Sequence, residues 1–287
     1  MLWRLYRKKG QPGHQTRTRA AAELVRRLAE ALPGRAFWLV GDDAYTNATV
    51  LRDRPANLHM LGPLGWDAAL YARPEPPTTK RRGAPRKKGH RLPNPRTMIE
   101  DTTTYPAAVE TIALPGIERS LRVQVIRDVL WYHACKTEPV AVVLVHDPSG
   151  QWRDAALVAT DPTVSAAFVI AGYCRRWSVE LTSFDSQQYL GLHDPRVWSA
   201  PSVERAHPMA WFVGTLTVLW YATAGHAGAH VHRHRPWYRH KVTPTFTDML
   251  GALRLQMWRH EIYGPTGSEE PSPEIIETLL HKMAAVA

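Results

Sequence analysis

The chain has 287 residues, enough to bury a sizeable core in one large domain or two smaller ones. Lys and Arg number 36 against 26 Asp and Glu, and the formal net charge of +10 favours a polyanionic partner, most commonly nucleic acid. Two cysteines exclude a disulfide framework and a cysteine-rich zinc site, which suits a reducing, cytoplasmic environment. The most apolar run, 209–224, is shorter than the roughly 20 residues that cross a bilayer, so it predicts a core helix and no membrane contact.

Helices and strands alternate in the first part of the chain. They are expected at 2–6 (strand), 18–32 (helix), 36–41 (strand), 47–52 (short helix) and 58–61 (strand). Asp42 and Asp43 directly follow the strand at 36–41. A carboxylate at the end of a buried strand commonly faces a ligand crevice in an α/β sheet, whereas an Asp that only forms the turn is the alternative of similar weight.

A proline-rich and strongly basic segment occupies 72–96. Such a segment cannot build a core, and it predicts a mobile basic loop that contacts nucleic-acid phosphates without reading bases. A solvated linker is the alternative. Its cations are Lys80, Arg81, Arg82, Arg86, Lys87, Lys88 and Arg91.

The later part of the chain predicts three strands and then helices. The strands are expected at 121–133, 139–146 and 155–159, and the helices at 202–224, 246–258 and within 268–287. A segment between two of these helices contains His226, His230, His232, His234 and His240. No acid or Cys accompanies these histidines and the arginines between them repel a cation, so we prefer a basic loop near nucleic acid over a metal site.

The stretch 159–196 predicts the central helix of the chain, with Asp161 as its N-cap, Pro162 at its first position and Gly191 as its stop. Side chains three and four residues apart share one helix face. On this face lie Tyr173, Arg176, Glu180, Phe184 and Gln187.

Two interpretations of that face are open. Trp177, Val179 and Leu181 indicate that the helix is substantially buried. In the first interpretation, the polar residues of this buried face only have satisfied hydrogen bonds and no further role. A carboxylate among cationic and aromatic groups is also typical of a metal-dependent phosphate site. The Arg176 and Glu180 pair beside Tyr173, in a strongly basic chain, favours the second interpretation.

The sequence around this face, YCRRWSVELTSFDSQQYLGLHDPRV, resembles the helix that carries the third catalytic acid in bacterial insertion-sequence transposases of the DDE type. Tyr173, Arg176 and Glu180 match the spacing of that group's Tyr-Arg-Glu-Lys signature, and Gln187 stands where the signature has Lys. LVGDDAYTNATVLRDRP is similar to the second-acid segment, with Asp42 in the catalytic place. RRGAPRKKGHRLP in the basic loop also resembles this family.

The resemblance implies an α/β chain with an RNase H-like core whose first strands are missing. It also implies a largely β insertion between the second Asp and the Glu helix. The corresponding segments are 1–65 (partial core with the second acid), 66–160 (basic loop and β-rich insertion), 161–260 (core helices with the third acid) and 261–287 (tail).

The implied activity is DNA transposition, in which Mg²⁺ or Mn²⁺ supports strand cleavage and joining by phosphoryl transfer. Asp42 and Glu180 would bind the metal, because Mg²⁺ prefers hard oxygen ligands. Arg176 would orient Glu180, and Tyr173 and Gln187 would contact the DNA end. The expected partners are transposon ends, target DNA and a second copy in a homodimer. The expected DNA contacts of the basic loop are Lys80, Arg81, Arg82, Arg86, Lys87 and Lys88.

The family's first acid has no counterpart, since no Asp or Glu precedes Glu23, which is expected on the polar side of a helix. We therefore expect a chain that begins after the first catalytic strand, has an unpaired sheet edge, and binds DNA without cutting it alone. The alternative is a non-catalytic basic DNA-binding remnant. An RNA-binding protein has less support, because the sequence contains no aromatic RNA-recognition motif.

Overall fold

The computed structural model describes residues 4–76, 84–114, 117–194, 198–227, 241, 243–262 and 273–285. They form two compact units: a sheet unit, Arg4–Ser178, and a helical unit, Val179–Ala287. Each unit has its own hydrophobic core.

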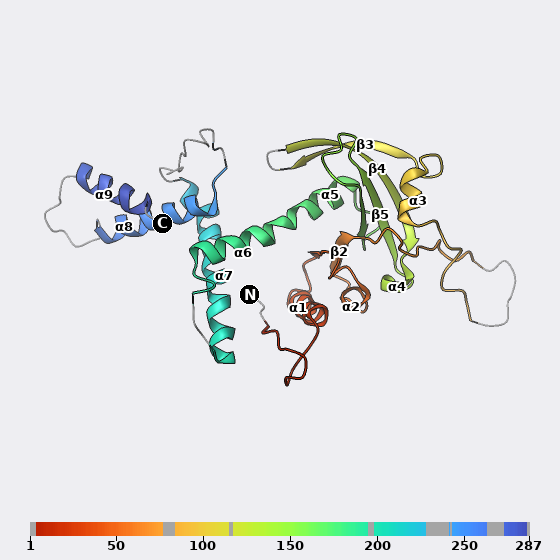
Figure 1. Ribbon diagram of the computed structural model, residues 1–287, viewed down its shortest axis with the longest axis horizontal. Helices are drawn as coiled ribbons and strands as arrows, with labels where there is room; N and C mark the ends of the chain where they lie inside the picture. Colours follow the sequence, from red (N-terminus) through yellow and green to blue (C-terminus); the bar gives the residue numbers. More distant parts are fainter. Residues whose placement is uncertain are drawn as a thin grey trace. The chain divides into compact units, whose positions relative to one another are not determined.

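The sheet unit combines helices and strands (Figure 1). In chain order its elements are α1 (Arg17–Ala31), β1 (Phe37–Val40), α2 (Ala48–Leu51), β2 (Leu58–Pro63), α3 (Pro95–Glu100), β3 (Ala107–Leu114), β4 (Ile117–Leu130), α4 (Tyr132–Cys135), β5 (Pro139–His146), β6 (Ala155–Ala159) and α5 (Ala166–Arg175). The elements of the helical unit are α6 (Trp177–Tyr189), which begins two residues before the boundary, α7 (Ala200–Thr223), η1 (Gly225–Ala227), α8 (Phe246–Ile262) and α9 (Pro273–Ala285).

The described strands form a six-stranded mixed sheet in the order β1-β2-β6-β5-β4-β3. β1 and β2 are parallel, with Phe37 opposite Leu58, and the other neighbours are antiparallel. Two strands from the predicted core segment and four from the predicted insertion therefore share one sheet. β1 and β3 are its two edge strands.

Both faces of the sheet are covered by helices. Successive side chains of β5 point to opposite faces, as the two-residue period of a strand requires, and Val140 to Leu144 are at most 1% exposed. Val142 packs in a cluster with side chains of α1 to α4, and Val143 packs in a second cluster with side chains of α5. This three-layer arrangement confirms the α/β class.

The central helix begins later than predicted. Asp161 accepts hydrogen bonds from the N–H and hydroxyl of Thr163, at 2.9 and 2.6 Å, which closes a separate turn. The N-cap is Ser165, whose hydroxyl accepts from the N–H of Phe168. Arg176 has helical angles (φ −52°, ψ −34°), so the backbone continues from α5 into α6. The predicted stop is confirmed at Gly191, which has φ +63°.

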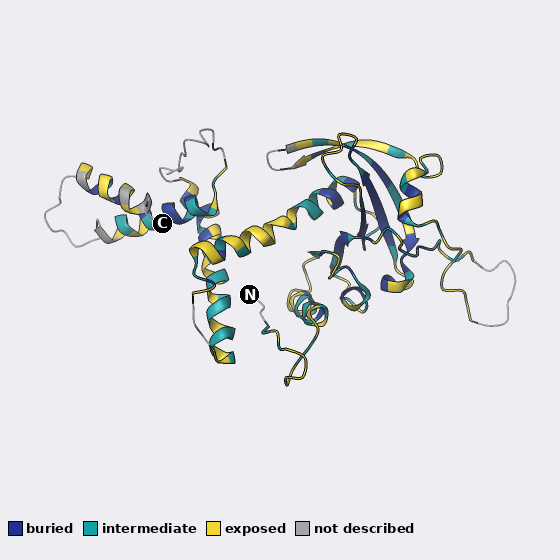
Figure 2. Ribbon diagram, viewed as in Figure 1, coloured by how far each residue is buried: buried dark blue, intermediate teal, exposed yellow. Residues whose placement is uncertain are grey.

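The expectation that this helix is substantially buried is wrong for α6 (Figure 2). Trp177, Val179 and Leu181 are 57, 65 and 53% exposed. The sheet's second face is covered instead by α5, where Val169 and Ile170 are buried. The apolar residues of the central helix therefore do not indicate that α5 is packed against the sheet while α6 is exposed.

The helical unit has a small hydrophobic core and a buried ion pair. Leu255 of α8 packs against Ile276 and Leu280 of α9, and the whole cluster is confined to these two helices. Lys241 forms a buried ion pair with Asp248, which also accepts from the N–H of Thr245 at 2.7 Å. The predicted core helix at 209–224 forms as part of α7, but several of its large apolar side chains are exposed.

Two further differences from the expected elements concern the sheet unit. Arg4–Tyr6 has no regular secondary structure, so the strand predicted at 2–6 is wrong for its described residues. β3 was not predicted, although it pairs along its whole length with β4. Its sequence, AAVETIAL, mixes helix-favouring and strand-favouring residues, and the pairing with β4 decides its conformation.

Candidate nucleic-acid interface

Asp42 lies in a tight turn directly after β1. Its Oδ1 accepts hydrogen bonds from the N–H groups of Ala44 and Tyr45, at 3.0 and 3.2 Å, and its backbone carbonyl accepts from the Thr46 hydroxyl at 2.9 Å. The other carboxylate oxygen, Oδ2, takes part in none of these bonds. The turn interpretation of Asp42 is therefore confirmed for one oxygen, and a ligand role for the other stays a prediction.

The turn after β1 is pressed against β2. A Cβ added at Gly62 would meet Oγ1 of Thr46 at 2.1 Å, so only glycine fits at that position of β2. Thr46 is itself buried, at 7% exposed. This close approach fixes the Asp42 backbone relative to the sheet, while Asp43 next to it is exposed.

The signature face on the central helix begins in α5. Gly172 lets α5 approach β2 closely, because a Cβ there would meet a methyl group of Leu61 at 2.9 Å. Tyr173 follows at once, and the Arg176 guanidinium lies over its ring at 5.9 Å from the centroid. The predicted three-residue spacing thus brings the cation and the phenol together.

The rest of that face belongs to the helical unit. Glu180 lies in the first turn of α6, Phe184 is 54% exposed, and Gln187 is exposed. Asp42 and Glu180 therefore lie in different compact units, and their joint binding of a metal stays a prediction. Within either unit, the described residues bring no three His, Cys, Asp or Glu side chains together as a metal-ligand cluster.

An aromatic pocket of about 290 Å³ lies beside Tyr173 and Arg176. Trp152 and Arg153, from the loop between β5 and β6, and Trp177 line it as well. Burial raises the pKa of the Cys174 thiol in the same wall, so this cysteine stays protonated and apolar. Aromatic faces stack on unpaired bases and arginines attract phosphates, so the pocket is suited to single-stranded nucleic acid.

A polar turn holds Trp152 at this pocket. Asp147 accepts hydrogen bonds from the N–H and hydroxyl of Ser149, at 2.8 and 2.6 Å, and from the N–H of Trp152 at 2.9 Å. The Arg119 guanidinium lies over the Trp152 ring at 5.1 Å. Sequence reasoning predicted the turn at 147–150 but missed Trp152 and Arg153, because no local pattern relates them to a helix that follows later in the chain.

The predicted basic loop is partly described. Arg86, Lys87 and Lys88 are exposed, whereas Lys80, Arg81 and Arg82 lie outside the described residues. The Lys88 ammonium lies 3.9 Å from the centroid of the Tyr71 ring and 5.3 Å from that of Tyr132. Residues 89–92 pair with 70–72 through backbone hydrogen bonds, so the loop's C-terminal end is fixed to the sheet unit.

The His-rich segment is largely outside the described residues, which include His226 but not His230, His232, His234 or His240. His226 lies in η1, where its Nδ1 is 3.1 Å from the carbonyl oxygen of Tyr221. The expected basic loop near nucleic acid therefore stays a prediction.

Compared with models of known protein families, the chain matches none, and a search of curated proteins also finds no match. The resemblance of the Glu180 helix to a transposase family therefore stays a prediction. Among the described helices, none has both the length and the apolar content that crossing a membrane requires.

Proposed function

We propose that this chain binds DNA and acts as a DDE-type transposase with an RNase H-like core, in which Asp42 and Glu180 are the metal-binding carboxylates. The observation that carries the proposal is that Arg176 lies over Tyr173 beside the aromatic pocket, with Glu180 four residues later in the sequence. A cation and aromatic rings next to a carboxylate are typical of sites that act on phosphates.

Each group has a distinct task in this proposal. Arg176 attracts the phosphate near the reacting bond, while Trp152 and Tyr173 stack against an unpaired base. Arg86 and Lys87 bind phosphates of the duplex without reading its sequence. The net charge of +10 favours DNA over a neutral partner at every encounter.

The chemistry of both side chains suits a divalent metal. Asp42 keeps Oδ2 outside the hydrogen bonds of its turn, and Asp and Glu oxygens are the ligands that Mg²⁺ prefers. Bound Mg²⁺ would activate the attacking water or 3′-hydroxyl and stabilise the leaving oxygen. The chain's own contribution is to hold the Asp42 backbone rigidly, through the contact between Gly62 and Thr46.

A second candidate is a basic DNA-binding protein without catalysis. The turn around Asp42 favours it, because Oδ1 already accepts two backbone N–H bonds and so has a structural role of its own. The two candidates differ in whether magnesium matters. In the first, Mg²⁺ strengthens DNA binding through Asp42 and Glu180, and in the second it does not.

Fluorescence anisotropy with a labelled duplex tests DNA binding itself. A plot of log affinity against log salt concentration falls less steeply when fewer phosphates are bound. Replacing Arg86, Lys87 and Lys88 by Ala should reduce the magnitude of its negative slope by about 2 to 3, because each lost phosphate contact removes about 0.9. A control variant with Ala at Lys8, Lys9 and Arg35, three exposed cations elsewhere in the sheet unit, should change the slope by less. An equal change in both variants would contradict a specific role for the basic loop.

The same assay with and without Mg²⁺ separates the two candidates. We expect Mg²⁺ to strengthen binding of the original chain and of Asp43→Asn, and to have no effect on Asp42→Asn or Glu180→Gln. Binding that ignores both magnesium and Asp42→Asn would favour the non-catalytic candidate. Because only two of the three acids of this chemistry are assigned, we expect the chain alone to bind DNA without cutting it. Mg²⁺-dependent cleavage that Glu180→Gln abolishes would contradict that expectation.

A further inference from the structure

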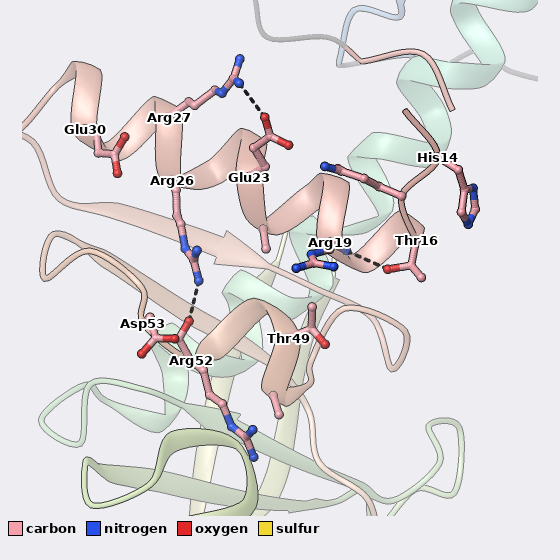
Figure 3. A pocket seen from close by; sticks show the side chains of 13 residues that line it. His14, Thr16, Arg19, Glu23, Arg26, Arg27, Glu30, Thr49, Arg52 and Asp53 are labelled. Atoms are coloured by element: carbon pink, nitrogen blue, oxygen red, sulfur yellow. Dashed lines mark hydrogen bonds and ion pairs between the residues drawn. The ribbon is translucent and has the colours of Figure 1, made fainter. Parts of the chain in front are cut away.

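A pocket lies between α1 and α2, and neither Asp42 nor Glu180 lines it (Figure 3). Its volume is about 890 Å³, and its walls come entirely from the sheet unit. Four arginines and three acids line it. They are Arg19, Arg26, Arg27, Arg52, Glu23, Glu30 and Asp53.

Part of this charge is already neutralised. Glu23 binds Arg27 at 2.6 Å and also forms an ion pair with Arg4. Glu30 lies eleven residues after Arg19 on α1, about 16 Å along the helix axis at 1.5 Å per residue. The end of the pocket near Arg19 is therefore positively charged.

Arg26 and Arg52 have unused hydrogen-bond donors. Arg26 donates through Nη2 to the carbonyl of Arg52 at 2.8 Å, and Arg52 donates through Nη2 to the carbonyl of His133 at 2.6 Å. In both side chains Nε is buried and has no hydrogen-bond partner in the described structure. These Nε groups are too buried to meet a ligand, but Nη1 of each guanidinium also takes no part in the two hydrogen bonds above, and it is the donor that an anion in the pocket would use.

The spacing of the arginines indicates the kind of anion. Arg19 and Arg26 are seven residues apart, so they share a helix face and lie about 10 Å apart along the axis. Figure 3 shows both side chains extending from α1 toward α2, with Thr49 facing them. Guanidinium groups bind phosphate oxygens in a forked geometry, and two of them at this spacing suit a ligand with more than one phosphate.

We propose that the α1–α2 pocket is a binding site for linked phosphate groups, with Arg19 and Arg26 as its main ligands. The phosphates come either from a small phosphorylated molecule or from the backbone of a nucleic-acid strand. The site does not depend on the proposed catalytic function, because it uses neither Asp42 nor Glu180 and needs no metal.

Titration calorimetry of the full chain with pyrophosphate, in a chelating buffer, tests whether the site binds linked phosphates. Fluorescence anisotropy with a short DNA duplex tests whether those phosphates belong to a small molecule or to a nucleic-acid strand. Arg19→Ala is the main variant, because Arg19 is exposed and its removal leaves the fold intact. Arg26→Gln is the second, and Arg35→Ala is the matched control, since Arg35 is exposed and does not line the pocket.

We expect Arg19→Ala and Arg26→Gln each to weaken pyrophosphate binding about tenfold or more, because each variant loses a charged hydrogen bond to the phosphate. Arg35→Ala should bind pyrophosphate as the original chain does. A parallel loss of DNA affinity assigns the phosphates to a nucleic-acid strand, and unchanged DNA affinity assigns them to a small molecule. Absence of pyrophosphate binding, or equal weakening in Arg19→Ala and Arg35→Ala, would overturn the proposal.

Discussion

The two units of this chain bury their apolar side chains to very different extents. In the sheet unit, Leu121, Val142 and Leu144 are at most 1% exposed, between helices on both faces of the sheet. In the helical unit, Phe212 and Leu219 of α7 are 46 and 55% exposed, although the second half of this helix is rich in large apolar residues. Apolar sequence alone therefore does not tell which segment forms a core.

The difference has a physical origin in the number of layers. A strand inside a sheet is enclosed by two neighbours and by helices above and below, so both sets of alternate side chains leave water. A helix in a small bundle buries only the face that meets a neighbour. We therefore expect most of the folding free energy to come from the sheet unit, and the pair Leu144→Ala and Leu219→Ala tests this.

The largest effect should come from Leu144→Ala. This side chain is buried in the cluster that joins β5 to the helices, and truncation leaves a cavity that costs about 2–5 kcal/mol of unfolding free energy. The matched variant Leu219→Ala, in α7, should cost less than about 1 kcal/mol because its side chain is already half exposed. Chemical denaturation measures both, and equal losses would refute the contrast between the units.

A smaller effect is expected from Gln124→Leu in β4. The buried side-chain amide of Gln124 donates to the carbonyl oxygens of Met98 and Tyr105, at 3.1 and 2.8 Å, and so attaches α3 to the sheet. Leucine has a similar size but leaves both carbonyls without this donor, at a cost of about 1–3 kcal/mol. Unchanged stability in denaturant would indicate that water replaces the amide, and that the layer above the sheet is more open than the structure indicates.

The smallest effect concerns acid stability. Hydrogen bonds, first of all from the Ser149 hydroxyl, hold the pKa of Asp147 below its ordinary value. Its stabilising contribution is therefore complete above pH of about 4, the unfolded value, and is lost as pH falls through the lower folded pKa. Asp147→Asn should flatten this part of the acid-unfolding curve and loosen Trp152, while Asp43→Asn, on an exposed turn, should not. Identical curves for all three proteins would contradict this assignment.

The sequence was sufficient for elements whose pattern is local. The bounds of the helix at 17–31 were predicted to within one residue, and those of the strands at 139–146 and 155–159 were predicted correctly. Periodicity and turn residues determine these elements. β3 was missed because only its partner makes it a strand. The start of α5 was misplaced because Asp161, a good N-cap, instead closes a turn with Thr163.

The candidate site also contains residues that local spacing predicts and residues that only the fold brings together. Tyr173 and Arg176 were expected to meet, since helical spacing alone brings them together, and they do. Trp152 and Arg153 reach the same pocket through the fold of β5 and β6, which no local pattern reveals. The α1–α2 pocket was missed for the same reason, because Arg26 lies on α1 whereas Arg52 directly follows α2.

The central proposal is that Asp42 and Glu180 bind one and the same metal ion. Mn²⁺ binding, followed by electron paramagnetic resonance, tests it with Asp42→Asn, Glu180→Gln and the double variant, and with Asp43→Asn as the control. If the two carboxylates share an ion, each single variant loses most of the affinity and the double variant loses little more. Independent, additive losses, or full Mn²⁺ binding in either single variant, would contradict the claim.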